Sequence, residues 1–586
     1  MKKILFIFVA LALCANAFAK PAWHGIYKHT LPDGTVVTLQ KHGDEFFHWT
    51  TDASGQVVEL DSNGWLRTVS TESFTLKRNS ARIKRAARNQ VYRSGEHIAV
   101  GQKRFLVILV EFSDVTFSTA NPRQDFDKML NQQGFSDRGA TGSARDYYYD
   151  NSHGYFEPVF DVFGPVQLEN EMAHYGGNDS GGNDLEAESA VMEGCKALDD
   201  EIDFSKYDLD GDGKVDLVFM FYAGYGEADS DVTDSIWPHR WYLSYAGKSV
   251  TLDGKKIDSY ACSNELIGFG EMKGQIDGIG AVCHEFGHAM GLPDFYDTDY
   301  TGNGYAGGTY DYSLMCGGTY NNESRTPPRL GIEERMLIGW IDESAVTEIA
   351  EKGNYTLEDL DSNTAFKTAT DENGEYFLYE CRAKTGWDAY IPEEGLIIYH
   401  VDKSTRSVSL DYGDGDVYNV PAIYLWDYWE NYNGLNMNGS HPCCYIVPAG
   451  DQSSLNYYGS KFAFPGAAYE TSFAPRSWNG VDSSVTLKNI SYSGGVVTFF
   501  ADAPSAELDY SVIANPGNGV YSAGDSFDLS LVEGEKRRVA SVQWYFDDEP
   551  VSGDSVVLRA GAHTVEAVIT LYSGATDTLT LDITVN

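Results

Sequence analysis

Residues 284–294 read His284-Glu285-Phe286-Gly287-His288-Ala289-Met290-Gly291-Leu292-Pro293-Asp294. His284 and His288 are four residues apart, so a helix would project both imidazoles from one face. Two imidazoles that lie this close together can share one tetrahedral metal ion. Glu285 follows the first histidine and can reach a water on that metal as a general base. The stretch therefore predicts a metal site and its base on one helix.

The second half of the same stretch predicts how the helix ends. Gly291 permits the left-handed turn that terminates a helix, and Pro293 prevents the helix from resuming. The turned chain can bring back Asp294 as a third ligand. Three protein ligands leave a fourth position open for water, which is typical of a catalytic zinc. Two alternatives stay open for the third ligand, namely Asp297 or a distant glutamate.

A methionine follows this motif within the stretch Tyr312-Ser313-Leu314-Met315-Cys316-Gly317-Gly318. A methionine in a tight turn soon after the zinc helix is typical of the Met-turn of metzincins, which underlies the metal site. A methionine is more commonly a simple core residue. Its position after the zinc motif favours the Met-turn for Met315.

Several segments resemble one family of zinc peptidases. Residues 284–297 (HEFGHAMGLPDFYD) resemble the signature of the M6, or immune inhibitor A-like, metallopeptidases, which carry an Asp where most metzincins carry a third His. The likeness extends over about residues 22–500 and includes 105–114 (FLVILVEFSD), 143–154 (SARDYYYDNSHG), 236–241 (IWPHRW), 380–382 (ECR) and 395–400 (GLIIYH). The resemblance implies a metzincin-like domain that hydrolyses peptide bonds, with zinc held by His284, His288 and Asp294.

The chain has 586 residues, which is too long for a single core. In the catalytic region we expect a strand at 105–112, a helix around Asp146, a strand at 217–222 and the zinc helix at 277–290. We predict a multidomain protein that combines α/β and all-β domains. Its parts are a signal peptide (1–19), a β-rich propeptide with a basic activation linker (20–95), an M6-like metalloprotease catalytic domain (96–344), a β-rich extension (345–503) and an immunoglobulin-like β-sandwich (504–586).

The N-terminus predicts the compartment. Lys2 and Lys3 precede an apolar run, and Ala17-Phe18-Ala19 supplies a small-x-small pattern, so cleavage after Ala19 is predicted. Cys14 raises the alternative of a lipid anchor, although the preceding leucine fits such a motif poorly. We therefore expect a secreted protein or one at a bacterial cell surface.

Charge and hydropathy narrow the partners. The net charge of −43 argues against nucleic acid or an anionic membrane as a partner. No later segment has 18 consecutive apolar residues, so no further membrane span is predicted. Seven cysteines follow the predicted leader, an odd number whose pairing the sequence leaves open. The expected partners are protein or peptide substrates; the oligomeric state is not predicted.

A basic linker suggests a zymogen. Residues 77–93 (KRNSARIKRAARNQVYR) contain seven basic residues and no acid. They predict either an exposed, protease-sensitive hinge or a solvated basic segment. Because no cysteine lies between residues 20 and 100, a cysteine switch is excluded. Asp44, in a Gly-Asp-Glu turn that resembles the aspartate switch of other metzincins, is the predicted latency residue.

A second metal site is predicted in an acidic loop. Alternate oxygens in a tight turn can surround calcium. A strand rather than a helix is expected to follow, so the loop is not a full EF-hand. A solvated acidic turn is the alternative. The candidate calcium ligands are Asp208, Asp210, Asp212, the backbone carbonyl of Lys214, and Asp216.

The sequence thus predicts a zinc endopeptidase. Zinc would polarise the scissile carbonyl and acidify a water, whose proton Glu285 would pass to the leaving amine. Tyr320 is a possible oxyanion donor and His239 a possible cleft residue, although each has an ordinary structural role as its alternative. An alternative of another class is an inactive protease-fold adhesin or binding protein that acts through its C-terminal sandwich.

Overall fold

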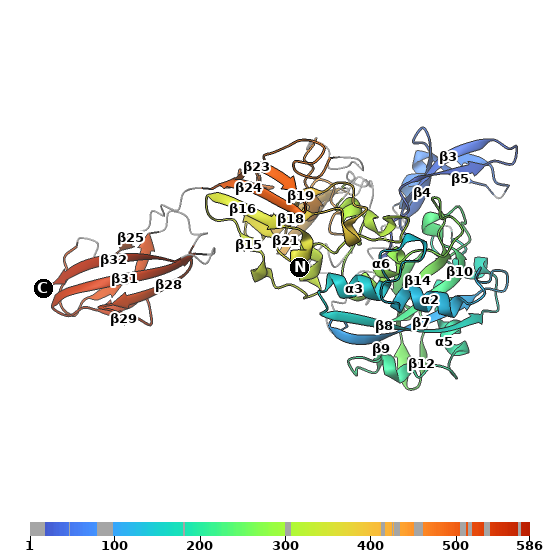
Figure 1. Ribbon diagram of the computed structural model, residues 1–586, viewed down its shortest axis with the longest axis horizontal. Coiled ribbons are helices and arrows are strands. Elements are labelled where there is room, and N and C mark those ends of the chain that lie inside the picture. The colour runs from blue at the N-terminus through green and yellow to red at the C-terminus, as the bar shows by residue number, and fades with distance from the viewer. Residues whose placement is uncertain are drawn as a thin grey trace, which may run out of the picture.

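A computed structural model of the chain describes residues 18–45, 47–61, 63–78, 98–179, 182–298, 306, 308–411, 417–424, 426, 434–450, 461–503, 511–513, 519–532, 539–571 and 576–586. The predicted leader up to residue 17, Cys14 included, and most of the basic linker lie outside these residues. The molecule is elongated, with an α/β region at one end, a β-rich region in the middle and a β module at the C-terminal end (Figure 1). Within the described residues, no helix is long and apolar enough to cross a membrane.

The N-terminal region forms the β-rich module that the alternating sequence predicts. It is an antiparallel sheet in which the strands follow one another in chain order. Gly34 and Gly55 adopt positive φ at two of its tight turns. The sheet lies against the α/β region (Figure 1). Its strands are β2 (Ile26–Thr30), β3 (Val36–Gly43), β4 (His48–Asp52), β5 (Val57–Leu60) and β6 (Leu66–Thr68).

A mixed six-stranded sheet organises the α/β region, in the order β1-β11-β14-β10-β7-β8. The four strands β14, β10, β7 and β8 are parallel to one another. At one edge, β11 is antiparallel to β14, and β1 is antiparallel to β11. The strands are β1 (Phe18–Ala19), β7 (Gly101–Glu111), β8 (Phe156–Gln167), β10 (Val218–Tyr225), β11 (His239–Tyr242) and β14 (Ser259–Leu266). A small second sheet contains β9 (Lys214–Val215), β12 (Val250–Leu252) and β13 (Lys255–Ile257).

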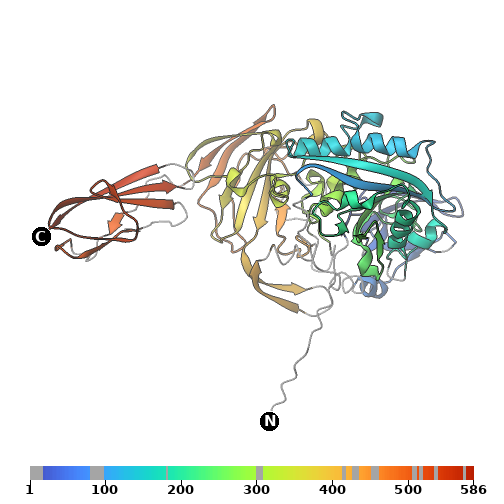
Figure 2. The same ribbon diagram turned by 90° about the horizontal axis from the view of Figure 1, so that it is seen from below.

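The apolar run in β7 is covered on both faces, as a continuous hydrophobic strand requires. Phe105 and Val107 belong to one buried cluster with side chains of α2, α3 and α6. Leu106 and Ile108 belong to a second cluster with side chains of α5. Figures 1 and 2 show the helices on the two sides of the sheet. The helices are α2 (Pro122–Asn131), α3 (Ala144–Asn151), α4 (Met172–Gly176), α5 (Ala187–Ala197), α6 (Gly280–Ala289) and α7 (Ile332–Leu337).

The zinc helix α6 is shorter than the sequence predicts. We expected residues 277–290, but the helix begins at Gly280. The start of the helix lies against a neighbouring loop, where the Gly280 amide donates to the Ser324 carbonyl at 2.7 Å. A Cβ on Gly280 would come within 1.9 Å of the Thr319 carbonyl oxygen. This close tertiary contact, which periodicity does not reveal, determines where the helix begins.

The middle region is built mainly of strands, as expected. A five-stranded sheet has the order β15-β17-β18-β19-β22, and a three-stranded sheet has the order β16-β24-β23. Side chains of the two sheets share one buried core. The strands are β15 (Thr347–Glu348), β16 (Gly353–Glu358), β17 (Phe366–Ala369), β18 (Glu375–Arg382), β19 (Gly395–Asp402), β20 (Thr405–Asp411), β21 (Val417–Tyr424), β22 (Cys444–Ile446), β23 (Thr486–Ser493) and β24 (Val496–Asp502).

Buried charges join this middle region to the α/β region. Arg382 on β18 donates to both oxygens of Asp388, at 2.8 and 2.7 Å, and to the Arg329 carbonyl at 3.2 Å. Glu380 accepts from the Ile332 amide at 2.6 Å, at the start of α7. Because buried charges are tolerated only when they are paired, these contacts hold the two regions together in one geometry.

The C-terminal module contains three small antiparallel sheets around a compact apolar core that includes Phe527 and Val565. Trp544, on β28, is half-buried against this core. The strands are β25 (Ser511–Ile513), β26 (Ser526–Asp528), β27 (Ser530–Val532), β28 (Val539–Phe546), β29 (Glu549–Pro550), β30 (Ser555–Val557), β31 (Gly561–Leu571) and β32 (Thr576–Val585). All seven cysteines in the described residues are buried, and none of them forms a disulfide there.

Candidate active site

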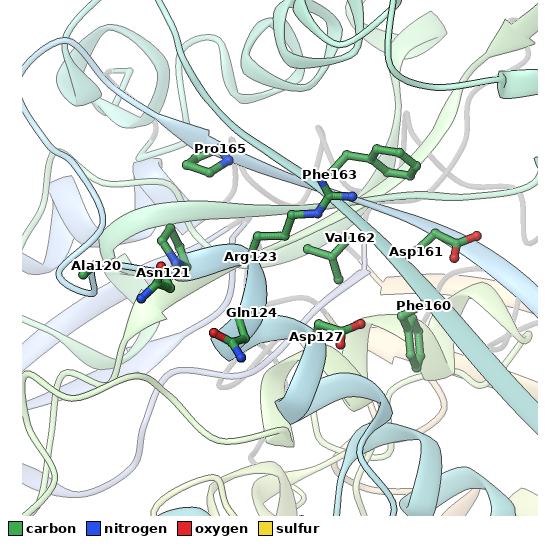
Figure 3. A pocket seen from close by; sticks show the side chains of 11 residues that line it. Ala120, Asn121, Arg123, Gln124, Asp127, Phe160, Asp161, Val162, Phe163 and Pro165 are labelled. Carbon is green, nitrogen blue, oxygen red and sulfur yellow. The ribbon is translucent and has the colours of Figure 1, made fainter.

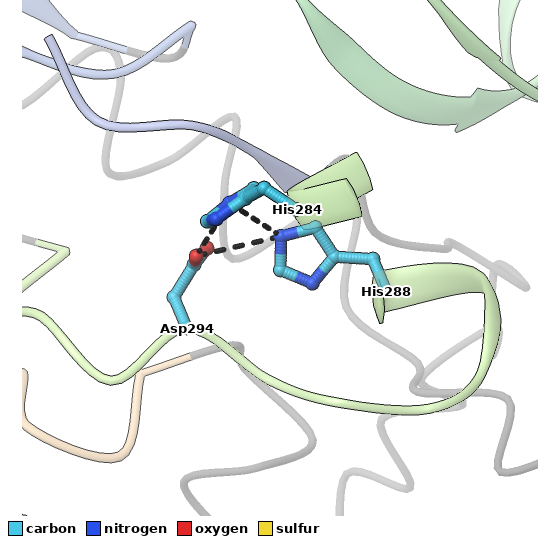
Figure 4. A group of neighbouring side chains, drawn as sticks. All are labelled: His284, His288 and Asp294. Atoms are coloured by element: carbon cyan, nitrogen blue, oxygen red, sulfur yellow. Dashed lines mark hydrogen bonds and ion pairs between the residues drawn. The ribbon is translucent and has the colours of Figure 1, made fainter. Parts of the chain in front are cut away.

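Three metal-ligating side chains meet at the end of α6 (Figure 4). The Nε2 atoms of His284 and His288 are 3.1 Å apart. Asp294 Oδ1 lies 3.3 Å from His284 Nε2 and 3.4 Å from His288 Nε2. All three residues are buried. The structure thus brings together the three residues that the sequence motif selects as ligands.

The outer hydrogen bonds of the two histidines show that this arrangement suits a cation. His284 Nδ1 lies 2.8 Å from the Leu314 carbonyl, and His288 Nδ1 lies 2.7 Å from the Leu292 carbonyl. A carbonyl accepts, so each Nδ1 carries the proton and each Nε2 presents a lone pair. Two lone pairs and a carboxylate oxygen at these separations repel one another unless a cation lies between them. The residues present therefore fit a zinc ion.

The turn after α6 returns Asp294 to the helix. Gly291 has φ of +101°, the left-handed conformation that the sequence predicts there. The Leu292 amide then donates to the Gly287 carbonyl at 3.1 Å, which closes the turn. Asp297, the alternative ligand, instead accepts from the Ala306 amide at 3.0 Å. No glutamate joins the His284, His288 and Asp294 cluster within the described residues.

Met315 lies beneath the zinc helix, where the Met-turn interpretation expects it. A Cβ on Gly287 would come within 2.8 Å of Met315 Sδ, so the absence of a side chain there permits the approach. The Met315 carbonyl accepts from the Phe295 amide at 2.9 Å, next to Asp294. The turn therefore supports both the helix and the ligand loop.

Glu285 is buried beside the three ligands. Its burial, together with the nearby carboxylate of Asp294, raises the pKa of Glu285 well above the ordinary value of a glutamate. Its Oε1 atom accepts a hydrogen bond from the backbone nitrogen of Lys20 at 2.8 Å, across 265 residues of sequence. A carboxylate with a raised pKa suits a group that both takes up and releases a proton.

The N-terminal segment around Lys20 packs beside Glu285, a contact that the sequence motifs do not reveal. Trp237 Nε1 donates to the Lys20 carbonyl at 3.1 Å. Tyr320, the candidate oxyanion donor, donates through its hydroxyl to the Pro21 carbonyl at 2.5 Å. The Trp23 amide donates to the Ala228 carbonyl at 3.0 Å. The one sequence signal for this segment is its position directly after the predicted leader.

His239 lies on the edge strand β11. Its Nδ1 is 2.6 Å from the Trp237 carbonyl, and its Nε2 is 2.8 Å from the Tyr260 hydroxyl. It also lines a cavity of about 170 Å³ that includes Asp184 and Glu45. Both ring nitrogens of His239 are therefore engaged by protein groups while the residue lines this cavity.

Asp44 does not join the metal-ligand cluster. Its Oδ1 accepts from the Phe47 amide at 3.1 Å and so closes its own turn. The described cluster of possible metal ligands comprises His284, His288 and Asp294. The backbone nitrogen of Lys20, also in the N-terminal segment, donates to Glu285 at 2.8 Å. The physical reason is that the Asp44 carboxylate satisfies a local backbone amide, as aspartates in turns commonly do.

The structure brings together part of the predicted calcium loop. Carboxylate oxygens of Asp208, Asp210 and Asp216 all lie within 4.8 Å of one another. Asp212 instead pairs with the ammonium group of Lys214 at 2.7 Å. Lys255 also contributes an ammonium group, 2.5 Å from Asp208. Strand β9 lies within the loop and β10 follows it, so a strand rather than a helix comes next, as the sequence predicts.

A larger cavity, of about 630 Å³, lies away from the metal ligands between α2 and β8. Its lining includes Arg123, Asp127 and Asp161 (Figure 3). The Arg123 guanidinium lies 5.3 Å from the centre of the Phe163 ring. The cavity shares no lining residue with the His284, His288 and Asp294 cluster. The volume of a cavity therefore does not identify the candidate active site in this protein.

Comparison with known proteins agrees with this site. Residues 94–331 match the family model described as immune inhibitor A peptidase M6, catalytic domain. The chain is 32% identical over 261 residues to the pre-pro-metalloprotease PrtV of Vibrio cholerae, and this match covers 38% of this chain and 28% of PrtV. It is 27% identical over 257 residues to immune inhibitor A of Bacillus thuringiensis, covering 38% of this chain and 37% of that protein.

The matched part thus spans well under half of each of these relatives. Crystal structures of OgpA from Akkermansia muciniphila include one that aligns with 85% of this chain and 98% of that chain, at 10% identity and a TM-score of 0.24. A TM-score this low is not evidence of a shared fold. The resemblance to the M6 signature is confirmed by the match over the segment that contains the metal ligands, and residues 94–331 belong to the peptidase M6 family of metallopeptidases.

Proposed function

We propose that the chain is a secreted zinc endopeptidase that hydrolyses extracellular proteins and is made as a zymogen. The observation that carries the proposal is the convergence of His284, His288 and Asp294 beside the buried carboxylate of Glu285. The antiparallel edge strand and the turn at Met315 support a metzincin-like catalytic domain. We infer an immunoglobulin-like sandwich for the C-terminal module from its small antiparallel sheets and its tryptophan strand.

The chain's own groups would carry the proton transfers. Zinc, when bound by the three ligands, would supply a Lewis acid for the scissile carbonyl and acidify a water. Glu285 would accept the proton of the attacking water and deliver it to the leaving nitrogen. The hydrogen bonds from Nδ1 of both histidines to backbone carbonyls keep each Nε2 deprotonated and aimed at the metal position.

Metal removal tests this function directly. Treatment of the processed protein with a chelator is expected to abolish casein hydrolysis, because the two histidines and Asp294 are the groups that would hold the metal. One equivalent of zinc should restore the rate, measured as release of acid-soluble peptides. Full activity in a preparation that metal analysis shows to be zinc-free would contradict the proposal.

The contacts of residues 20–23 support a zymogen. If the leader is removed after Ala19, the new terminus is Lys20, whose nitrogen is hydrogen-bonded to Glu285. The Lys20 carbonyl accepts from Trp237, and the Pro21 carbonyl accepts from Tyr320. The segment would then remain in the cleft and exclude substrate until the basic linker is cut. The name of one relative, a pre-pro-metalloprotease, agrees with this organisation.

Deletion of residues 20–23 from the uncleaved zymogen is expected to raise its basal hydrolysis at least about tenfold, because the hydrogen bonds that hold the segment in the cleft are lost. Initial rates on a fluorogenic peptide would be measured while mass spectrometry shows an intact linker. Trp65→Ala, an exposed change on the same module, is the control. If Asp44→Asn raised the basal hydrolysis and the deletion did not, the hypothesis that Asp44 causes latency would be supported instead.

We also propose a structural calcium ion in the loop of Asp208, Asp210 and Asp216. Binding to the folded state at 100 times Kd would stabilise the protein by about 2.7 kcal/mol. Calcium should therefore raise the melting temperature of the zinc-loaded protein by several degrees. Asp210→Asn should remove this shift, whereas the exposed Asp199→Asn should keep it. Identical melting curves with and without calcium would exclude the site.

A further inference from the structure

The N-terminal segment passes along the edge strand β11 and reaches the carboxylate of Glu285. Strand β1 pairs antiparallel with the edge strand β11, with Ala19 opposite His239. The next backbone nitrogen, that of Lys20, lies 2.8 Å from Glu285 Oε1. In peptide hydrolysis the base passes its proton to the nitrogen of the residue that follows the scissile bond. Lys20 therefore occupies the position of that residue.

The side chain of Lys20 enters a closed acidic pocket. Its ammonium lies 3.1 Å from Asp229 Oδ2, and both side chains are 0% exposed. The same ammonium lies 5.1 Å from the centre of the Tyr320 ring. The other carboxylate oxygen, Asp229 Oδ1, is buried and has no hydrogen-bond partner among the described residues. A second donor, such as the fork of an arginine, would satisfy it.

Further basic side chains from the N-terminal module contact the same turn. Lys41 Nζ donates to the carbonyls of Glu227 and Ser230, at 2.6 and 3.0 Å. His48 Nε2 lies 3.2 Å from Glu227 Oε1. When residues 20–95 leave, the buried acids Glu227 and Asp229 lose the contacts with Lys20, Lys41 and His48. An uncompensated buried carboxylate is costly, so the emptied pocket favours a ligand that carries a positive charge.

We propose that Asp229 ends the pocket for the residue directly after the scissile bond and selects lysine or arginine there. The inference rests on the proposed endopeptidase function and specifies its substrate class. Glu227 adds negative charge at the same turn, whereas Tyr320 supplies an aromatic wall. Asp229 is a specificity-determining residue rather than a catalytic one, since it contacts the side chain of the substrate and not the reacting atoms.

The test uses the processed, zinc-loaded enzyme and fluorogenic peptides that differ only after the scissile bond. Lysine or arginine there should give a kcat/KM at least about tenfold above that of methionine, and glutamate should give a lower value still. Asp229→Asn should reduce the lysine-to-methionine ratio at least about fivefold, mainly through KM. Asp231→Asn, a half-exposed neighbour on the same loop, should keep the parent ratio.

Equal cleavage of the lysine and methionine peptides would overturn the inference while the endopeptidase function stood. A ratio that Asp229→Asn does not alter would overturn it as well. Failure of zinc-loaded enzyme to cleave casein or any peptide would instead refute the function, and the inference with it.

A binding measurement needs no substitution at Asp229. The tetrapeptide Lys-Pro-Ala-Trp, which matches residues 20–23, should bind processed Glu285→Gln enzyme at least about tenfold more tightly than Met-Pro-Ala-Trp in a calorimeter. Equal affinities would contradict the acidic pocket whether or not the Asp229 variant folds.

Discussion

Replacement of Glu285 by glutamine is expected to lower kcat for peptide hydrolysis by about 10³-fold or more, because the amide cannot take the proton of the attacking water. Glutamine has the shape of glutamate, so the three ligands and the packing of α6 should remain. Zinc content, measured by atomic absorption, should therefore equal that of the parent. The loss should appear in kcat rather than in KM.

Glu201→Gln, an exposed change on the same domain, is the matched control and should keep the parent rate. A Glu285→Gln enzyme that hydrolyses casein at the parent rate would sink the proposed mechanism. If the parent itself lacks activity although it binds zinc, the alternative of a protease-fold binding protein would gain support, and the C-terminal module would become the part to study.

Replacement of Gly280 by alanine is expected to destabilise the catalytic domain by about 3 kcal/mol or more. The new Cβ would lie 1.9 Å from the Thr319 carbonyl oxygen and 3.2 Å from Ser324 Cα. Because backbone rather than a flexible side chain stands there, α6 or the neighbouring loop must move. A shift at the start of α6 would be transmitted to both histidines, so zinc affinity should fall as well.

Thermal unfolding and zinc titration would measure both effects. Gly353→Ala provides the control, because a Cβ on Gly353 meets no atom within 4 Å. That variant should melt within about 2 °C of the parent. A Gly280→Ala protein with the parent melting temperature and the parent zinc affinity would contradict the steric argument.

The parts of the site that could be predicted are those encoded by local spacing. The interval between His284 and His288 follows from the helical repeat, and the turn at Gly291 follows from the freedom of glycine at positive φ. These features depend on neighbours in the chain, so a single sequence contains them. The beginning of α6 could not be predicted, because it depends on a loop some 40 residues further along the chain.

The proposed latency contact illustrates the same limit. Asp44 lies in a turn that resembles an aspartate switch, but its carboxylate accepts from an amide of its own turn. Lys20 carries no motif, yet its nitrogen meets Glu285 and its ammonium meets Asp229, 209 residues away. Contacts over such separations depend on how the sheets pack, and no periodicity in the sequence reports them.

The sequence by itself predicted the three candidate metal ligands and the candidate base and pointed to the family, since each prediction depends on residue types at fixed short intervals. Only the tertiary structure decided which segment of the chain lies beside Glu285. It brought the N-terminal segment alongside the edge strand and buried the ammonium of Lys20 against Asp229. The physical reason is that a buried charge requires a partner, and the fold, not the local sequence, decides which residue supplies it.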